Sequence, residues 1–226
     1  MAKATAQPGP ARTAEIFARF QAQNPHPHSE LAFSSPFQLL VAVVLSAQCT
    51  DERINKVTKA LFAAYPTPQT MAQAGEKAIL DHIKSVTYPN SKARYLADLS
   101  TQLVALHHGQ VPDDLAALEA LPGVGHKTAS VVLAVAFGKP ALPVDTHVLR
   151  VANRLGLVHN ANTPQKVEKQ LKALLPEDSW AHAHHWLLLH GRYVCKAQRP
   201  SCNQCFLADL CPNRQETPSR KGKTNP

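Results

Sequence analysis

The chain has 226 residues, enough for one or two domains with a hydrophobic core. Hydrophobic residues make up 44% of the sequence, which excludes an intrinsically disordered chain. With 24 Lys and Arg against 16 Asp and Glu, the formal net charge is 24 − 16 = +8, and this excess favours an anionic partner, nucleic acid first. On charge alone, a basic protein without such a partner stays an open alternative.

The N-terminal residues 1–11 are rich in Ala, Gln and Pro and lack the apolar core of a signal peptide. The longest apolar run, residues 37–47, has about half the length of a membrane span. We therefore expect a cytoplasmic protein without membrane contact, associated with the nucleoid if its source is bacterial. We also expect a monomer.

Apolar residues follow helical spacing through most of the chain, and no segment alternates as a strand does. The first strongly apolar helix, which Pro36 opens, is apolar on most faces and is expected to be central and buried. Asp51 is expected to cap the second helix and Asp113 to open a later short one. The predicted helices cover residues 37–47, 51–65, 71–74, 77–84, 90–108, 113–120, 127–137, 145–155, 164–175 and 179–190. The predicted fold class is therefore all-α.

A glycine-rich turn, Leu-Pro-Gly-Val-Gly at residues 121–125, lies between two of these helices. Gly123 and Gly125 permit a tight turn, and with Val124 between them they leave backbone N–H groups uncovered at a helix N-terminus. Such a helix-hairpin-helix grips a DNA backbone without reading its sequence. An ordinary loop that uses Gly only for its conformation is the alternative.

Four of the five cysteines lie within 17 residues near the C-terminus: Cys195, Cys202, Cys205 and Cys211. Four thiolates in a short segment predict a closed metal site. Only one pair is as close as zinc sites usually require, and the wider spacings favour a [4Fe–4S] cluster, with zinc as the open alternative. Basic residues in the same loop, among them Arg199, could reach a phosphate or could offset the charge of the cluster.

Lys127 and Asp145 are the two candidate catalytic residues. Lys127 follows the glycine turn at a helix start, where the helix dipole disfavours a cation. A residue that conflicts with its local structure is a candidate for function, although a solvated surface Lys is the alternative. Asp145 precedes a helix, where Asp is usually an N-cap.

These motifs together resemble the endonuclease III family of DNA glycosylase/AP lyases. The resemblance runs in family order over residues 30–211. The matching segments are Leu-Ser-Ala-Gln-Cys-Thr-Asp at 45–51, Asn-Ser-Lys-Ala at 90–93, Leu-Pro-Gly-Val-Gly-His-Lys-Thr-Ala at 121–129, Val-Asp-Thr-His-Val at 144–148, and the four-cysteine loop. The resemblance implies that the metal centre is a [4Fe–4S] cluster.

The resemblance also implies two helical domains between flexible ends. A six-helix barrel-like domain at residues 29–139 would contain the helix-hairpin-helix, and residues 12–28 with 140–211 would form the cluster domain. Residues 1–11 and the basic tail 212–226 are expected to be flexible. DNA would lie across a cleft between the domains, where Lys127 and Asp145 would meet.

The implied reaction removes oxidised pyrimidines from duplex DNA. The base must leave the stack, so Gln48 would fill the vacated space and Tyr88 would wedge the opposite strand. Lys127 would attack C1′ and form a Schiff base, and β-elimination would cut the strand there or at an abasic site. Asp145 would stabilise positive charge at the sugar or take a proton, because its own charge would hold the Lys127 amine protonated.

One segment departs from the family. The chain has Thr-Tyr-Pro at 87–89 where the usual family pattern is Gly-Leu-Tyr. This departure keeps open a second function, a non-catalytic or weakly catalytic DNA-binding iron–sulfur protein. The presence of both Lys127 and Asp145 argues against that alternative.

Overall fold

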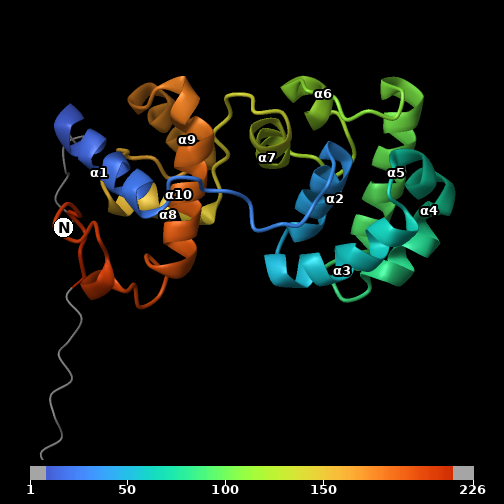
Figure 1. Ribbon diagram of the computed structural model, residues 1–226, viewed down its shortest axis with the longest axis horizontal. Coiled ribbons are helices and arrows are strands. Elements are labelled where there is room, and N and C mark those ends of the chain that lie inside the picture. Colours follow the sequence, from blue (N-terminus) through green and yellow to red (C-terminus); the bar gives the residue numbers. More distant parts are fainter. Residues whose placement is uncertain (1–8, 216–226) are drawn as a thin grey trace, which may run out of the picture. The chain divides into compact units, whose positions relative to one another are not determined.

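Figure 1 shows the chain as a computed structural model, which describes residues 9–215 and contains only helices and loops in that range. The predicted all-α fold class is confirmed. The described residues divide into two compact units: His28–Pro143 forms one, and the segments up to Pro27 and from Val144 onward form the other. The flexible ends expected from the sequence fall mainly on residues 1–8 and 216–226, which lie outside the described range.

The unit His28–Pro143 is built around one buried helix. Its helices are α2 (Pro36–Ser46), α3 (Asp51–Ala64), α4 (Pro68–Ile83), α5 (Pro89–His107), α6 (Leu115–Glu119) and α7 (His126–Ala136). The α2 helix packs against α3, α5 and α7 (Figure 1). Every residue from Leu39 to Leu45 is buried, because apolar side chains cover nearly all faces of the helix. The expected central helix is confirmed.

The caps of two helices each lie one residue away from the predicted acidic residue, one residue earlier at α3 and one residue later at α6. The side chain of Thr50, not Asp51, caps α3, and Asp114, not Asp113, caps α6. Asp51 lies instead in the first turn of α3, where the helix dipole stabilises a negatively charged side chain. Asp113 forms an ion pair with Lys139 at 2.7 Å, which holds it outside the helix.

The other unit combines α1 (Pro10–Gln23) with α8 (Thr146–Arg154), α9 (Pro164–Leu174), α10 (Trp180–Tyr193) and the loop that follows α10. The α8 helix packs against both α9 and α10. The Phe20 ring stacks on Trp186 with 6.2 Å between centroids and meets Phe206 edge-on at 5.4 Å. This aromatic core binds α1 to α10 and to the loop.

The α1 helix begins at Pro10. Residues 10 and 11, which were expected to belong to a flexible N-terminus, are therefore helical. Over residues 9–215, no helix has the length and apolarity needed to cross a membrane.

Candidate active site and four-cysteine loop

The glycine-rich turn joins α6 to α7. Gly123 has φ +76°, a conformation that glycine adopts readily and other residues rarely do. Gly125 is the N-cap of α7, which no described side chain caps, so the amides of its first turn can serve a phosphate. Val124 differs from its expected role: its side chain is only 6% exposed and its N–H donates to the Leu121 carbonyl at 3.1 Å. Neither group is therefore available to DNA.

Gly123 is also fixed by a close neighbour, the ring of Tyr95. A Cβ added at Gly123 would lie 2.8 Å from Tyr95 Cγ. Gly123→Ala is therefore expected to lower the free energy of unfolding by about 1–3 kcal/mol, which urea denaturation measures. In the control Gly125→Ser, the added Cβ meets nothing within 4 Å and the hydroxyl suits an N-cap. Equal losses in the two variants would contradict this account.

Lys127 is the second residue of α7, and its side chain is exposed. Just before it, His126 Nδ1 lies 2.6 Å from Oε1 of Glu119 at the end of α6, so the two helices of the hairpin are tied together. The Asp113–Lys139 ion pair joins the segment before α6 to the segment after α7. The amine of Lys127 is thus carried on a helix start that is held from both sides.

Asp145 caps α8, as Asp before a helix usually does. Its Oδ1 accepts the N–H groups of His147 and Val148, each at 2.8 Å. Both bonds use Oδ1, so Oδ2 lies outside the cap and can serve another partner. The side chain is half-buried. Asp145 and Lys127 belong to different units, and each stands at or next to the N-terminus of a helix.

Gln48 and Tyr88 share an unusual backbone conformation. Both are left-handed, with φ values of 57° and 55°, and both side chains are exposed. The Thr87 hydroxyl donates to the Gln48 carbonyl at 3.0 Å. The structure therefore brings these two loops together, although α3 and α4 separate them along the chain.

The four cysteines line a single pocket at the end of α10: Cys195, Cys202, Cys205 and Cys211. Among the described residues, no three His, Cys, Asp or Glu side chains are grouped as they would be to hold one metal ion. Four cysteines around one pocket match the ligand number of a four-iron cluster, which takes one thiolate on each iron.

The surroundings of the sulfur atoms also fit a cluster. Burial raises the pKa of the Cys205 and Cys211 thiols, and the neighbouring cysteines raise it further. Backbone N–H groups bond to both sulfurs, and Arg154 Nη1 lies 3.4 Å from Cys195 Sγ. Crowded thiolates need positive charge, which iron supplies, and such hydrogen bonds stabilise iron-bound sulfur.

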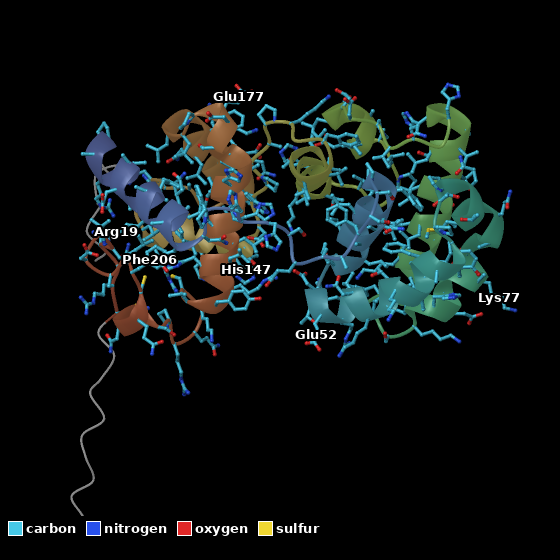
Figure 2. All side chains as sticks on the ribbon, viewed as in Figure 1. Arg19, Glu52, Lys77, His147, Glu177 and Phe206 are labelled. Carbon is cyan, nitrogen blue, oxygen red and sulfur yellow. The ribbon has the colours of Figure 1, made fainter. Side chains whose placement is uncertain are left out.

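The α1 helix holds the other side of this loop. Arg19 forms two bonds to the Asp209 carboxylate, at 2.7 and 2.9 Å, and donates to the Phe206 carbonyl at 2.9 Å. Figure 2 shows Arg19 of α1 beside Phe206 of the loop. Arg12 adds bonds of 2.6 Å to carbonyls in the loop and after α8.

Arg199, the predicted phosphate contact, lies on the loop with φ 50° and an exposed side chain.

Two residues in these sites were not predicted. Lys92 is only 5% exposed, whereas a Lys on a helix normally faces solvent. His190 Nε2 lies 3.5 Å from Cys205 Sγ, and burial lowers the pKa of His190 to about 4. The only sign of these two residues in the sequence was their place beside a motif. Lys92 lies within Asn-Ser-Lys-Ala, and His190 lies shortly before the first cysteine of the loop.

Comparison with known proteins gives two family matches. Residues 41–177 match the HhH-GPD superfamily base excision DNA repair protein, and residues 195–211 match the iron-sulfur binding domain of endonuclease III. Endonuclease III of Treponema pallidum (strain Nichols) is 50% identical over 196 residues, which cover 87% of this chain and 92% of that protein. Endonuclease III of Escherichia coli (strain K12) is 47% identical over 206 residues, covering 91% and 97%.

A solved structure of a trapped endonuclease III–DNA covalent intermediate, an estranged-adenine complex, matches with a TM-score of 0.87. It is 42% identical and covers 92% of this chain and 97% of that one.

Proposed function

Because the chain belongs to the endonuclease III family, we propose that it excises oxidised pyrimidines from duplex DNA and cuts the strand through a Schiff base on Lys127. It is a DNA glycosylase/AP lyase of base excision repair and carries a [4Fe–4S] cluster. The observation that carries the residue assignment is the exposed Lys127 in the first turn of α7, a helix whose N-cap, Gly125, has no side chain to cap it.

The reaction needs a nucleophile beside bound phosphate. The amides of the first turn of α7 hold the DNA backbone without reading its sequence, which brings the sugar to the Lys127 amine. The amine nitrogen bonds to C1′, the N-glycosidic bond breaks, and the base departs with the electron pair and takes up a proton. The C1′–O4′ bond then breaks as the nitrogen lone pair forms the C=N bond of the imine, and O4′ takes up a proton that the amine gives up. Removal of a C2′ proton expels the 3′ phosphate, and water hydrolyses the imine, which frees Lys127 and leaves an unsaturated aldehyde on the sugar remnant.

Asp145 is the proposed partner of Lys127 in catalysis. Its Oδ2 lies outside the helix cap and can face the positive charge that develops on the sugar, or can accept a proton in transit. The carboxylate is held by the cap, so it needs no rearrangement when that charge forms.

A substitution at Asp145 can distinguish the role of its charge in catalysis from its role as the N-cap of α8. Asp145→Asn keeps an oxygen that can cap α8, so the free energy of unfolding is expected to stay within about 0.5 kcal/mol of the wild type. Single-turnover base release is expected to slow by about 100-fold, because the carboxylate charge is lost. Asp98→Asn, which removes an exposed carboxylate on α5, is the control. Base release at the wild-type rate in Asp145→Asn would remove Asp145 from the catalytic site.

The remaining contacts serve the DNA substrate. Gln48 would enter the space that the extruded base leaves, Tyr88 would separate the opposite strand, and Arg199 would pair with a phosphate. The four cysteines Cys195, Cys202, Cys205 and Cys211 would hold the cluster, which when bound would cross-link the loop that carries Arg199. The proposed partner is duplex DNA with a damaged base or an abasic site. The protein would act as a cytoplasmic monomer without membrane contact, on the nucleoid if its source is bacterial.

Product analysis on a duplex with one thymine glycol tests the proposed function. The expected products are the free base, a 5′ phosphate and a 3′ unsaturated aldehyde, the ends that β-elimination leaves. An undamaged duplex of the same sequence should stay intact. Release of the base with the strand uncut would contradict the lyase step. A damaged strand that keeps its base and stays uncut would contradict both steps.

A further inference from the structure

Gln48 and Tyr88 each hold a backbone conformation that their side chains do not favour. A left-handed residue other than glycine is strained and persists only where its surroundings over-determine it. Gln48 lies between α2 and α3, and Tyr88 is the N-cap of α5 directly before Pro89. Something other than local preference must therefore hold both residues.

Thr87 provides three bonds between the two loops. Its N–H donates to Cys49 Sγ at 3.2 Å, and its hydroxyl donates to the Gln48 carbonyl at 3.0 Å. The Cys49 thiol in turn donates to the Thr87 hydroxyl oxygen at 3.3 Å. One residue thus fixes the backbone on both sides of the Gln48–Cys49 peptide. A glycine, which the usual family pattern has at this position, carries no hydroxyl and makes neither side-chain bond.

Lys92 holds the same loop from inside the unit. Its Nζ donates to the carbonyls of Leu45 at 2.8 Å and Ala47 at 2.7 Å, the last turn of α2, and lies 3.9 Å from Cys49 Sγ. Burial lowers the pKa of Lys92, which shows the cost of placing an ammonium there. The carbonyl end of a helix is where a cation is best received.

We infer that Thr87 and Lys92 are positioning residues, which hold Gln48 and Tyr88 as one rigid pair for opening the duplex. This inference rests on the proposed function. A pair that is already rigid can enter the base stack of the duplex without the loss of conformational entropy that ordering two flexible loops would require. Chemistry at Lys127 on a strand that is already single does not need the pair.

Thr87→Val tests the inference, because it keeps the side-chain shape and removes the hydroxyl. Single-turnover excision of thymine glycol from a duplex is expected to slow by about tenfold, because the bond to the Gln48 carbonyl and the weaker bond from the Cys49 thiol are both lost. Strand cutting at an abasic site in single-stranded DNA is expected to match the wild type. Thr87→Ser should restore duplex excision. Thr101→Val is the matched control, because the Thr101 hydroxyl donates to the Ala97 carbonyl within α5.

A second readout follows base extrusion directly. 2-Aminopurine opposite the lesion should brighten less on binding of Thr87→Val than on binding of the wild type. Lys92→Met, which leaves two carbonyls without their donor, should show the same pattern with a larger loss in duplex excision. Equal slowing on duplex and single-stranded DNA would overturn the inference, as would wild-type rates on both. If the wild type itself releases no base, the proposed function fails, and this result is distinct from either outcome.

Discussion

Lys127→Ala is expected to abolish strand cutting at both thymine glycol and abasic sites, with a loss of at least about 1,000-fold. The amine is the proposed nucleophile, and alanine offers no atom that can bond to C1′. Affinity for the damaged duplex should change by less than about fivefold, because Lys127 faces the sugar and is only one of the 24 Lys and Arg residues of the chain. Single-turnover cutting and a binding titration at the same salt concentration measure the two quantities.

The control for this variant is Lys59→Ala, which removes an exposed lysine from α3 in the same unit. It should cut at the wild-type rate. Cutting by Lys127→Ala within threefold of the wild type would show that another group attacks the sugar. A large loss of affinity in Lys127→Ala would instead place Lys127 among the phosphate contacts.

Cys202→Ala is expected to lose the iron–sulfur cluster and, with it, most of the DNA affinity. Four thiolates line the pocket, and removal of one leaves the cluster incompletely held. Loop residues 195–211 then lose the cross-link that presents Arg199, and affinity should fall by at least about tenfold. Absorption near 400 nm and iron content follow the cluster, and a binding titration follows the loop.

Two variants in the same loop distinguish the contribution of the cluster to DNA affinity from the contribution of the Arg199 charge. Asn203→Ala changes an exposed neighbour of Cys202 and should keep both iron and affinity. Arg199→Ala should keep iron and weaken binding to damaged and undamaged duplexes alike, since a phosphate contact carries no sequence information. A Cys202→Ala protein that lacks iron yet binds with full affinity would contradict the proposed role of the cluster.

The parts of this protein that depend on local sequence could be predicted. Continuous apolar residues identify α2 as the central helix, and the spacing of four cysteines identifies the cluster loop. The caps of α3 and α6 were each placed one residue wrong, because two side chains that can cap stand side by side. At α6 the choice depends on Lys139, a partner far along the chain.

The parts that depend on distant contacts could not be predicted. The three bonds of Thr87 reach residues 38 and 39 positions away, and those of Lys92 to α2 span 45 and 47 positions. No helical period or turn pattern carries such information. For the same reason the departure at Thr87 reads, in sequence, as a loss of a family feature, whereas in the structure it supplies the bonds that join the two loops.

Borohydride trapping of the wild-type protein tests the central claim most directly. The protein is incubated with a duplex carrying one thymine glycol, the imine is reduced, and the adduct is digested and mapped by mass spectrometry. We expect one covalent adduct, with the sugar remnant on the peptide that contains Lys127. An adduct on any other residue, or release of the base with no adduct at all, would contradict the assignment of Lys127 as the nucleophile.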